Sequence, residues 1–499
     1  MYYQVQSRGD KMRKSGILLH ISSLSSKYGV GTMGEEAYKF IDFLALSGQK
    51  AWQVLPIGHT SYGDSPYQSY SSYAGNPYFI DFDILFSEGL LEEADLKNIP
   101  REKDEERVDY GSLFQYRFPI LKKAAKAFLE KPSAEYYTFL EENRAWLDDY
   151  ATFMAIKEAN GHKGREEWDI TLRVKGEASE KFSDCETARI YKAIQFFFFS
   201  QWFKLKEYAN EKGIEIIGDL PIYCASDSSD VWSESRIFLL DEEFIPHTVA
   251  GVPPDGFSPE GQRWGNPIYD WDVLEKTKYA KWVERLAHTL KIFDTVRIDH
   301  FRGFDSYFAI DVKEPTAVNG RWVDGPGMKL FKAFEKELGQ NLPIIAEDLG
   351  YLTESVKKLL SDTGYPGMKI LQFAFDERES GDYLPHNYPV NSVCYVGTHD
   401  NDTALGWYEN VAASDREKAE KYLSLTKEEG ISKGLIRGAM SSVSELSVIC
   451  MQDWLNLGSE ARMNTPSTNS GNWQWRMKKG DLTPSLAEKI KEMTSLYGR

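Results

Sequence analysis

The sequence predicts an α/β protein, a (β/α)8 TIM barrel with a large, mostly helical insertion between its second and third strands. Short β-type apolar runs that end in Gly, Pro or a charged residue alternate with amphipathic helical stretches, as is typical of a parallel sheet. Eight such runs occur, which is the strand number of this barrel. The length of 499 residues also suits one barrel of about 250 residues with an insertion. The expected strands are residues 16–20, 51–56, 215–222, 295–299, 343–347, 368–375, 393–397 and 446–451.

The helices between these strands are predicted by three- and four-residue spacing of apolar side chains, which gives each helix one buried face. Glycine follows several of these stretches, at Gly48, Gly213 and Gly339, where a helix that ends in a left-handed residue needs it. The clearest apolar stripe consists of Tyr279, Trp282, Val283, Leu286 and Leu290.

The insertion is expected where the strand spacing is anomalous. About 150 residues separate the second strand from the third, and residues 82–212 are mostly helical in pattern with charged faces. We therefore expect residues 82–212 to form a subdomain that grows from one barrel loop. Residues 13–81 and 213–499 would form the catalytic barrel and its rim loops.

The composition favours a globular protein with a neutral ligand. Hydrophobic residues make up 42% of the chain and charged residues 27%, near the usage of globular proteins. The net charge of -17 repels phosphate backbones and anionic lipid headgroups, so we expect neither nucleic acid nor membrane as a partner. The most apolar short run, residues 196–199, is far shorter than the ~20 residues of a membrane span.

The cysteine pattern and the N-terminal residues bear on the cellular compartment. The cysteines are widely spaced and form no C-x-x-C pair, which suits free thiols in a reducing compartment. Residues 1–14 are polar and basic, without the apolar stretch of a secretory signal. We therefore expect a cytoplasmic location. The cysteines are Cys185, Cys224, Cys394 and Cys450.

Carboxylates follow three of the expected strands. In such barrels the active site lies at the C-terminal ends of the strands. Asp299 ends the fourth strand, Glu347 ends the fifth, and Asp400 follows the seventh. Each alone has a structural explanation, because a strand-terminal Asp often caps a helix and a Glu often forms a salt bridge. Three acidic strand ends together favour a functional site at one rim.

Basic residues accompany these carboxylates. Side chains alternate along a strand, so Arg297 and Asp299 share one orientation, and the guanidinium can hold the carboxylate ionised. His300 and His399 each adjoin an Asp, as neutral hydrogen-bonding groups would. They have no H-x-x-x-H spacing or comparable ligand pattern, so metal catalysis is not favoured.

Two facing carboxyl groups are what acetal cleavage requires, because one attacks or stabilises the anomeric carbon and the other protonates the leaving oxygen. The proton donor must stay neutral at the working pH, and a neighbouring negative charge raises a carboxyl pKa. Asp299 would be that neighbour for Glu347. The residues therefore predict cleavage of a glycosidic bond.

Aromatic side chains in polar loops are candidate sugar platforms, since flat rings suit the apolar faces of pyranose sugars. Most of the 13 Trp, 28 Tyr and 27 Phe are expected in the core. Exceptions lie in two turn-rich loops, residues 61–78 and 261–267, where packing within the loop itself is the alternative. They are Tyr62, Tyr67, Tyr70, Tyr73 and Trp264.

Several segments, in order along the chain, carry a resemblance to a known family. Besides the three carboxylate segments, they are GDSPYQ (63–68), GDLPIY (218–223), GQRWGNP (261–267) and NTP (464–466). From about residue 16 to residue 475 the chain resembles the amylomaltases. These are disproportionating 4-α-glucanotransferases, glycoside hydrolase family 77 of the α-amylase clan.

The resemblance implies a retaining enzyme that needs no cofactor and moves α-1,4-glucan segments between maltodextrins. It implies Asp299 as the nucleophile, Glu347 as the acid/base and Asp400 as the carboxylate that grips and distorts the sugar at the cleavage point. A retaining mechanism predicts ~5 to 5.5 Å between the carboxyl groups of Asp299 and Glu347. By the same carry-over the substrate-binding residues are Tyr67, Asp219, Trp264, Arg297, His300 and His399.

Two alternatives stay open: a glucan hydrolase with the same residues, and a non-catalytic glucan-binding barrel. Whether the acceptor site excludes water separates transfer from hydrolysis, and the intact carboxylates count against a mere binder. One departure from the family pattern is Gly256, where relatives often have a tyrosine before Phe-Ser. We therefore expect no aromatic acceptor contact there and a more mobile 253–258 loop.

Overall fold

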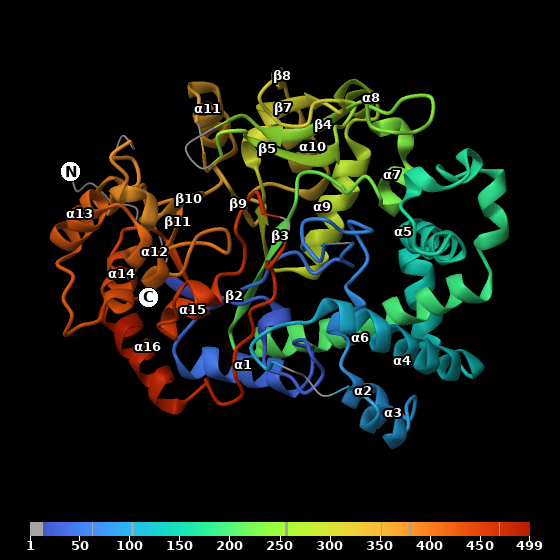
Figure 1. Cartoon of the computed structure of the whole chain (residues 1–499), viewed down its shortest axis with the longest axis horizontal. Coiled ribbons are helices and arrows are strands. Elements are labelled where there is room, and N and C mark those ends of the chain that lie inside the picture. Colours follow the sequence, from blue (N-terminus) through green and yellow to red (C-terminus); the bar gives the residue numbers. More distant parts are fainter. Residues whose placement is uncertain are drawn as a thin grey trace, which may run out of the picture.

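The computed structural model describes residues 13–61, 63–100, 104–254, 258–350, 352–378, 381–468 and 470–499. Its centre is a closed barrel of eight parallel strands, in the order β1-β12-β11-β10-β9-β6-β3-β2 (Figure 1). The predicted barrel is confirmed. Its strands are β1 (Lys14–Leu18), β2 (Ala51–Gln53), β3 (Glu215–Leu220), β6 (Thr295–Ile298), β9 (Ile344–Ala346), β10 (Gly367–Ile370), β11 (Ser392–Tyr395) and β12 (Leu446–Cys450).

These strands are buried along nearly their whole length, with every residue buried in β2 and β11 and all but the first in β1 and β6. Parallel strands covered on both faces appear in a sequence as continuous apolar runs. This is why the eight strands could be located from the sequence.

A second sheet, which is antiparallel, was not predicted. Its strand order is β5-β4-β7-β8. Strands β4 and β5 lie in the connection after β3, and strands β7 and β8 lie in the connection after β6. It therefore extends the C-terminal ends of two neighbouring barrel strands, at the top of Figure 1. Its strands are β4 (Thr248–Val252), β5 (Gln262–Pro267), β7 (Ser306–Asp311) and β8 (Arg321–Asp324).

The segment between β2 and β3 is helical, as predicted, and lies mostly at the right of Figure 1. Its last long helix, α6, packs against α4, α5 and the barrel helix α1. The Trp202 indole of α6 donates a hydrogen bond to the Ile292 carbonyl, at 3.2 Å, and so ties the insertion to the barrel. The boundaries at residues 82 and 212 stay a prediction. The helices are α2 (Phe82–Ser87), α3 (Glu93–Lys97), α4 (Tyr110–Glu130), α5 (Ala134–Ala159) and α6 (Glu186–Glu211).

The helices outside the insertion include those that follow the barrel strands. The three glycines predicted to follow helical stretches have left-handed φ angles, which are 75° at Gly48, 73° at Gly213 and 98° at Gly339. Tyr279 belongs to the predicted stripe but lies before helix α9 with φ 57°, and it is still buried. The helices are α1 (Glu35–Leu46), α7 (Ser229–Ser233), α8 (Trp271–Lys276), α9 (Ala280–Ile292), α10 (Met328–Leu338), α11 (Glu354–Thr363), α12 (Ala404–Asn410), α13 (Ala413–Leu423), α14 (Ile431–Met440), α15 (Met451–Trp454) and α16 (Pro484–Leu496).

Two further findings concern the helices and the cysteines. Within the described ranges, no helix has the length and apolar character that a membrane crossing needs. All four cysteines are free thiols, three of them buried.

Candidate active site

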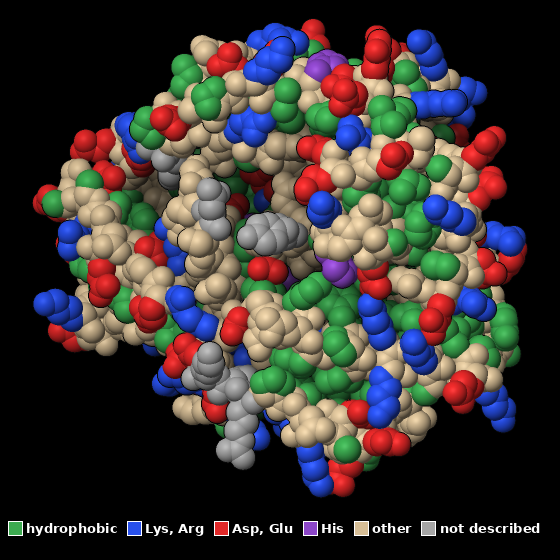
Figure 2. Space-filling view, turned by 45° about the vertical axis from the view of Figure 1, so that its right-hand side comes forward, with side chains coloured by type: hydrophobic (Ala, Val, Ile, Leu, Met, Phe, Trp, Pro, Cys, Tyr) green, Lys and Arg blue, Asp and Glu red, His purple; other side chains and the backbone are tan. Residues whose placement is uncertain are grey.

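One cavity of about 2210 Å³ opens where the barrel strands end, and Figure 2 shows the hollow near the middle of one face. It is lined by the carboxylates that follow β6, β9 and β11, so the three predicted strand ends meet in one place. Asp219 and His399 lie behind this lining and contact it through Tyr67. The predicted residues that line the cavity are Tyr67, Trp264, Arg297, Asp299, His300, Glu347 and Asp400.

The buried Arg297 guanidinium joins two carboxylates. Its Nη1 lies 2.6 Å from Asp219 Oδ2, and its Nη2 lies 3.1 Å from Asp299 Oδ1. The register of β3 against β6 sets Asp219 opposite Arg297. Because Arg297 and Asp299 are two residues apart, their side chains share one side of the strand end. The guanidinium thus fixes the position of Asp299 at the cavity wall.

Tyr67 continues this chain of contacts to the other side of the cavity. Its hydroxyl lies 2.9 Å from Asp219 Oδ2 and 2.9 Å from His399 Nε2. A phenol has one proton, and the Asp219 carboxylate beside Arg297 only accepts, so Tyr67 donates to Asp219. His399 Nε2 must then carry a proton and donate to Tyr67. The hydrogen-bond network therefore assigns the Nε2–H tautomer to His399.

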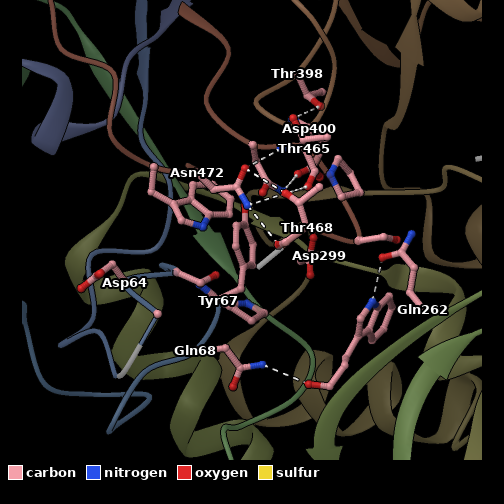
Figure 3. Close-up of a pocket in the computed structure, with 18 of the residues that line it drawn as sticks. Asp64, Tyr67, Gln68, Gln262, Asp299, Thr398, Asp400, Thr465, Thr468 and Asn472 are labelled. Atoms are coloured by element: carbon pink, nitrogen blue, oxygen red, sulfur yellow. Dashed lines mark hydrogen bonds between the residues drawn. The ribbon is translucent and has the colours of Figure 1, made fainter. Parts of the chain in front are cut away.

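Asp400 faces the same space as Asp299 and Tyr67 (Figure 3). His399 Nε2 lies 3.4 Å from Asp400 Oδ2, and the pKa of His399 is lowered by burial, so the ring is neutral. Asn464 Nδ2 donates to Asp400 Oδ1 at 2.6 Å, and Arg462 donates to its backbone carbonyl at 2.7 Å. Asn464 and Arg462 were not predicted as site residues, although Asn464 belongs to the NTP segment (464–466) that carries the family resemblance.

Backbone groups hold Glu347. The N–H groups of His300 and Leu349 donate to its two carboxylate oxygens, at 2.6 and 3.2 Å. His300 adopts a left-handed φ of 49°, a conformation that residues other than glycine rarely take and that occurs at functional sites. The His300 ring also meets Trp264 edge to face, with centroids 4.8 Å apart. The turn after Asp299 therefore contacts both the Glu347 carboxylate and the Trp264 ring.

The carboxyl groups of Asp299 and Glu347 both have raised pKa values. The pKa of Asp299 is raised to about 7, chiefly by burial; Arg297 opposes the rise, and the negative charges of Asp219 and Asp400 add to it. Burial raises the pKa of Glu347 well above its ordinary value, and the negative charge of Asp299 adds to this. A raised pKa is what a proton donor needs, and the charge of Asp299 is one cause of the rise at Glu347.

The other predicted aromatic residues differ in whether they line the cavity. Tyr70 lines the cavity, whereas Tyr73 lies outside its lining and stacks on Trp146 of α5, with centroids 6.2 Å apart. Tyr62 and the Gly256 departure lie outside the described residues. The described side chains also contain no group of three His, Cys, Asp or Glu placed to hold a metal ion.

The fold and the site together define the class of barrel enzymes that act on glycosidic bonds through paired carboxyl groups. A family model described as 4-alpha-glucanotransferase matches residues 19–483. The chain belongs to this 4-α-glucanotransferase family.

Relatives and solved structures agree with this assignment. A 4-alpha-glucanotransferase of Clostridium butyricum is 52% identical over 487 residues, which cover 96% of this chain and 100% of that protein. The Thermus thermophilus 4-alpha-glucanotransferase is 46% identical, with 98% of this chain and 98% of that protein covered. The amylomaltase of Streptococcus agalactiae, solved in complex with acarbose, superposes with a TM-score of 0.95 at 46% identity, over 98% of this chain and 99% of that one.

Proposed function

We propose that the chain transfers α-1,4-glucan segments between maltodextrins by a retaining double displacement. The observation that carries this is the presence in one cavity of Asp299, held by Arg297, and Glu347, whose pKa is raised by burial and by the charge of Asp299. The family match and the acarbose-bound amylomaltase support an α-glucan substrate. The cavity volume of about 2210 Å³ exceeds the ~300 to 1,000 Å³ of ordinary small-molecule sites, which suits a chain of several sugars.

In the first step Asp299 attacks the anomeric carbon. A bond forms between this carbon and an Asp299 oxygen while the glycosidic C–O bond breaks, and the leaving oxygen takes the proton of Glu347. The leaving chain departs with a new hydroxyl group. Glu347 is then ionised beside a neutral ester, so it can accept a proton in the second step.

In the second step the 4-hydroxyl of an acceptor sugar attacks the same carbon. Glu347 takes the hydroxyl proton, the new glycosidic bond forms, and Asp299 leaves as a carboxylate. Two inversions at one carbon retain the α configuration. The separation of ~5 to 5.5 Å between the two carboxyl groups stays a prediction, which a crystal structure with bound substrate would test.

Asp400 and the chain of Tyr67, His399 and Asp219 are proposed to hold the sugar at the cleavage point. Asp400 is fixed by Asn464 on one oxygen and lies 3.4 Å from the donor nitrogen of His399 on the other. A carboxylate held this way accepts hydrogen bonds from sugar hydroxyls in one geometry and can favour a distorted ring.

A product analysis tests the activity. Incubation with maltotriose should give glucose and longer dextrins. Glucose and maltose alone would indicate the hydrolase, and an unchanged substrate would indicate a glucan-binding barrel without activity.

Both steps are completed by the side chains of this chain, so we propose that no metal or organic cofactor takes part. Transfer activity should survive prolonged chelation. A loss that one specific divalent ion restores would contradict this.

We also infer a cytoplasmic location from the four free thiols, three of them buried. Cell fractionation with antibody detection tests it, and recovery in the secreted or membrane fraction would contradict it.

A further inference from the structure

Trp322 is an exposed aromatic residue on the edge strand β8, and no role in the proposed reaction has been given to it. It is 41% exposed and lines the same cavity as Asp299 and Glu347. A Trp side chain with so much exposed area is unusual, because Trp is highly buried on average. Single exposed apolar residues need no explanation, but this one faces the substrate cavity.

The indole is held in place before any substrate arrives. The Arg302 guanidinium lies 3.9 Å from its centroid and covers one face, and Phe308 of β7 meets it at 5.1 Å and 66°. Phe308 is also the cross-strand partner of Trp322. Arg302 is itself buried and donates to Ser306 Oγ at 3.2 Å. Arg302 and Trp322 both line the cavity, and the guanidinium leaves the other face of the ring available for a ligand.

The position of Trp322 relative to the two carboxyl groups indicates which sugars it meets. Arg302 lies in the turn Phe301–Phe304, directly after His300, whose N–H holds Glu347. Glu347 exchanges its proton with the leaving or incoming sugar. Tyr67 and Asp400 instead contact His399. The link from Trp322 through Arg302 and this turn to Glu347 favours the acceptor side for Trp322.

We infer that Trp322 is a stacking platform for a glucose unit of the acceptor chain, beyond the unit that is joined. This inference rests on the proposed function and adds a specificity-determining residue to it. The apolar C–H face of a pyranose stacks on an aromatic face, and the guanidinium behind the ring keeps that face rigid. A rigid platform loses little conformational entropy on binding. Acceptors long enough to reach it should bind more tightly than glucose.

The experiment uses α-glucosyl fluoride as donor, because its leaving group occupies no acceptor subsite, and compares glucose with maltoheptaose as acceptor. Trp322→Ala should raise the KM for maltoheptaose by about tenfold more than the KM for glucose, a loss typical of a buried Trp contact. Trp322→Phe, which keeps a smaller ring, should give an intermediate ratio. Val318→Ala is the matched control, since Val318 is 55% exposed and outside the cavity lining. Circular dichroism and Tm verify the fold of each variant.

An equal change in both KM values for Trp322→Ala, or a ratio unchanged from the wild type, would overturn the inference while leaving the proposed function intact. A wild-type protein that elongates neither acceptor would overturn the proposed function, and the inference with it.

Discussion

At the scale of single residues, the Arg297 guanidinium lies between two carboxylates, 2.6 Å from Asp219 and 3.1 Å from Asp299. Part of this was predictable, because the two-residue spacing of Arg297 and Asp299 sets them on one side of a strand. The contact of Arg297 with Asp219 also depends on the register of β3 against β6, which no local pattern encodes. The left-handed backbone of His300 was unpredictable for the same reason, since tertiary contacts impose it.

Loss of the Arg297 charge should shift the acid limb of the pH profile. Asp299 attacks only when ionised, so kcat/KM falls as the pH drops through its pKa, which burial raises to about 7. The guanidinium opposes that rise. Arg297→Gln should therefore raise the pKa further and move the acid limb to higher pH. Arg297→Lys keeps the positive charge and should move it less. The measurement is kcat/KM for α-glucosyl fluoride as a function of pH. If the acid limb of Arg297→Gln is unchanged or moves to lower pH, the acid limb does not report the ionisation of Asp299.

Tyr67→Phe should lower kcat by about tenfold or more, because it removes the hydroxyl that joins Asp219 to His399, and a hydrogen bond to a charged group contributes about 1.5 to 3 kcal/mol. Tyr73→Phe is the matched control, since Tyr73 lies outside the cavity lining. Initial rates with maltotriose give kcat for both variants. Similar rates for both would show that the hydrogen-bond chain has no part in the reaction.

At the scale of elements, the buried parallel strands were predictable and the antiparallel sheet was not. The β5 strand, Gln262–Pro267, contains two glycine or proline residues and three polar ones, so its sequence has no apolar alternation. It forms because β4 supplies a partner and the barrel holds both. The sequence showed the apolar run within α6, but it did not show that Gln195 and Gln201 of the same helix are buried.

Those two glutamines attach α6 to the segment after β2. Gln195 accepts from the Gly75 N–H at 2.8 Å and donates to its carbonyl at 2.9 Å, and Gln201 does the same with Asp81 at 2.7 and 3.2 Å. Gln195→Ala leaves a buried donor and acceptor without partners, which costs about 1 to 3 kcal/mol for each group. Its Tm should fall by several degrees. Lys204→Ala, on an exposed position of the same helix, should leave Tm nearly unchanged. Differential scanning calorimetry measures Tm, and equal Tm values for the two variants would contradict this role of Gln195.

At the scale of the whole molecule, the cavity is bounded by parts of the chain that lie far apart in sequence. Its lining includes Phe114 of the insertion, Trp322 of the antiparallel sheet and Trp407 of α12, besides the barrel carboxylates. The net charge of -17 disfavours anionic partners and leaves a neutral polysaccharide unaffected. The barrel thus supplies the three carboxylates, and the added elements extend the cavity around them. Sequence patterns located these carboxylates but could not predict how the added elements surround them.

Asp299 is proposed as the nucleophile and Glu347 as the acid/base, and two variants separate these roles. α-Glucosyl fluoride needs no proton for its leaving group, so Glu347→Gln should still form the glucosyl ester on Asp299. The ester should persist, because nothing activates the acceptor hydroxyl. With ordinary glucans the same variant should lose at least the ~10² to 10⁴-fold that general acid catalysis contributes. Asp299→Asn should react with neither donor.

Mass spectrometry of each variant after mixing with α-glucosyl fluoride is the most direct measurement. We expect a glucosyl adduct in Glu347→Gln, on the peptide that contains Asp299, and none in Asp299→Asn. An adduct on another residue, or equal adduct formation in both variants, would contradict it.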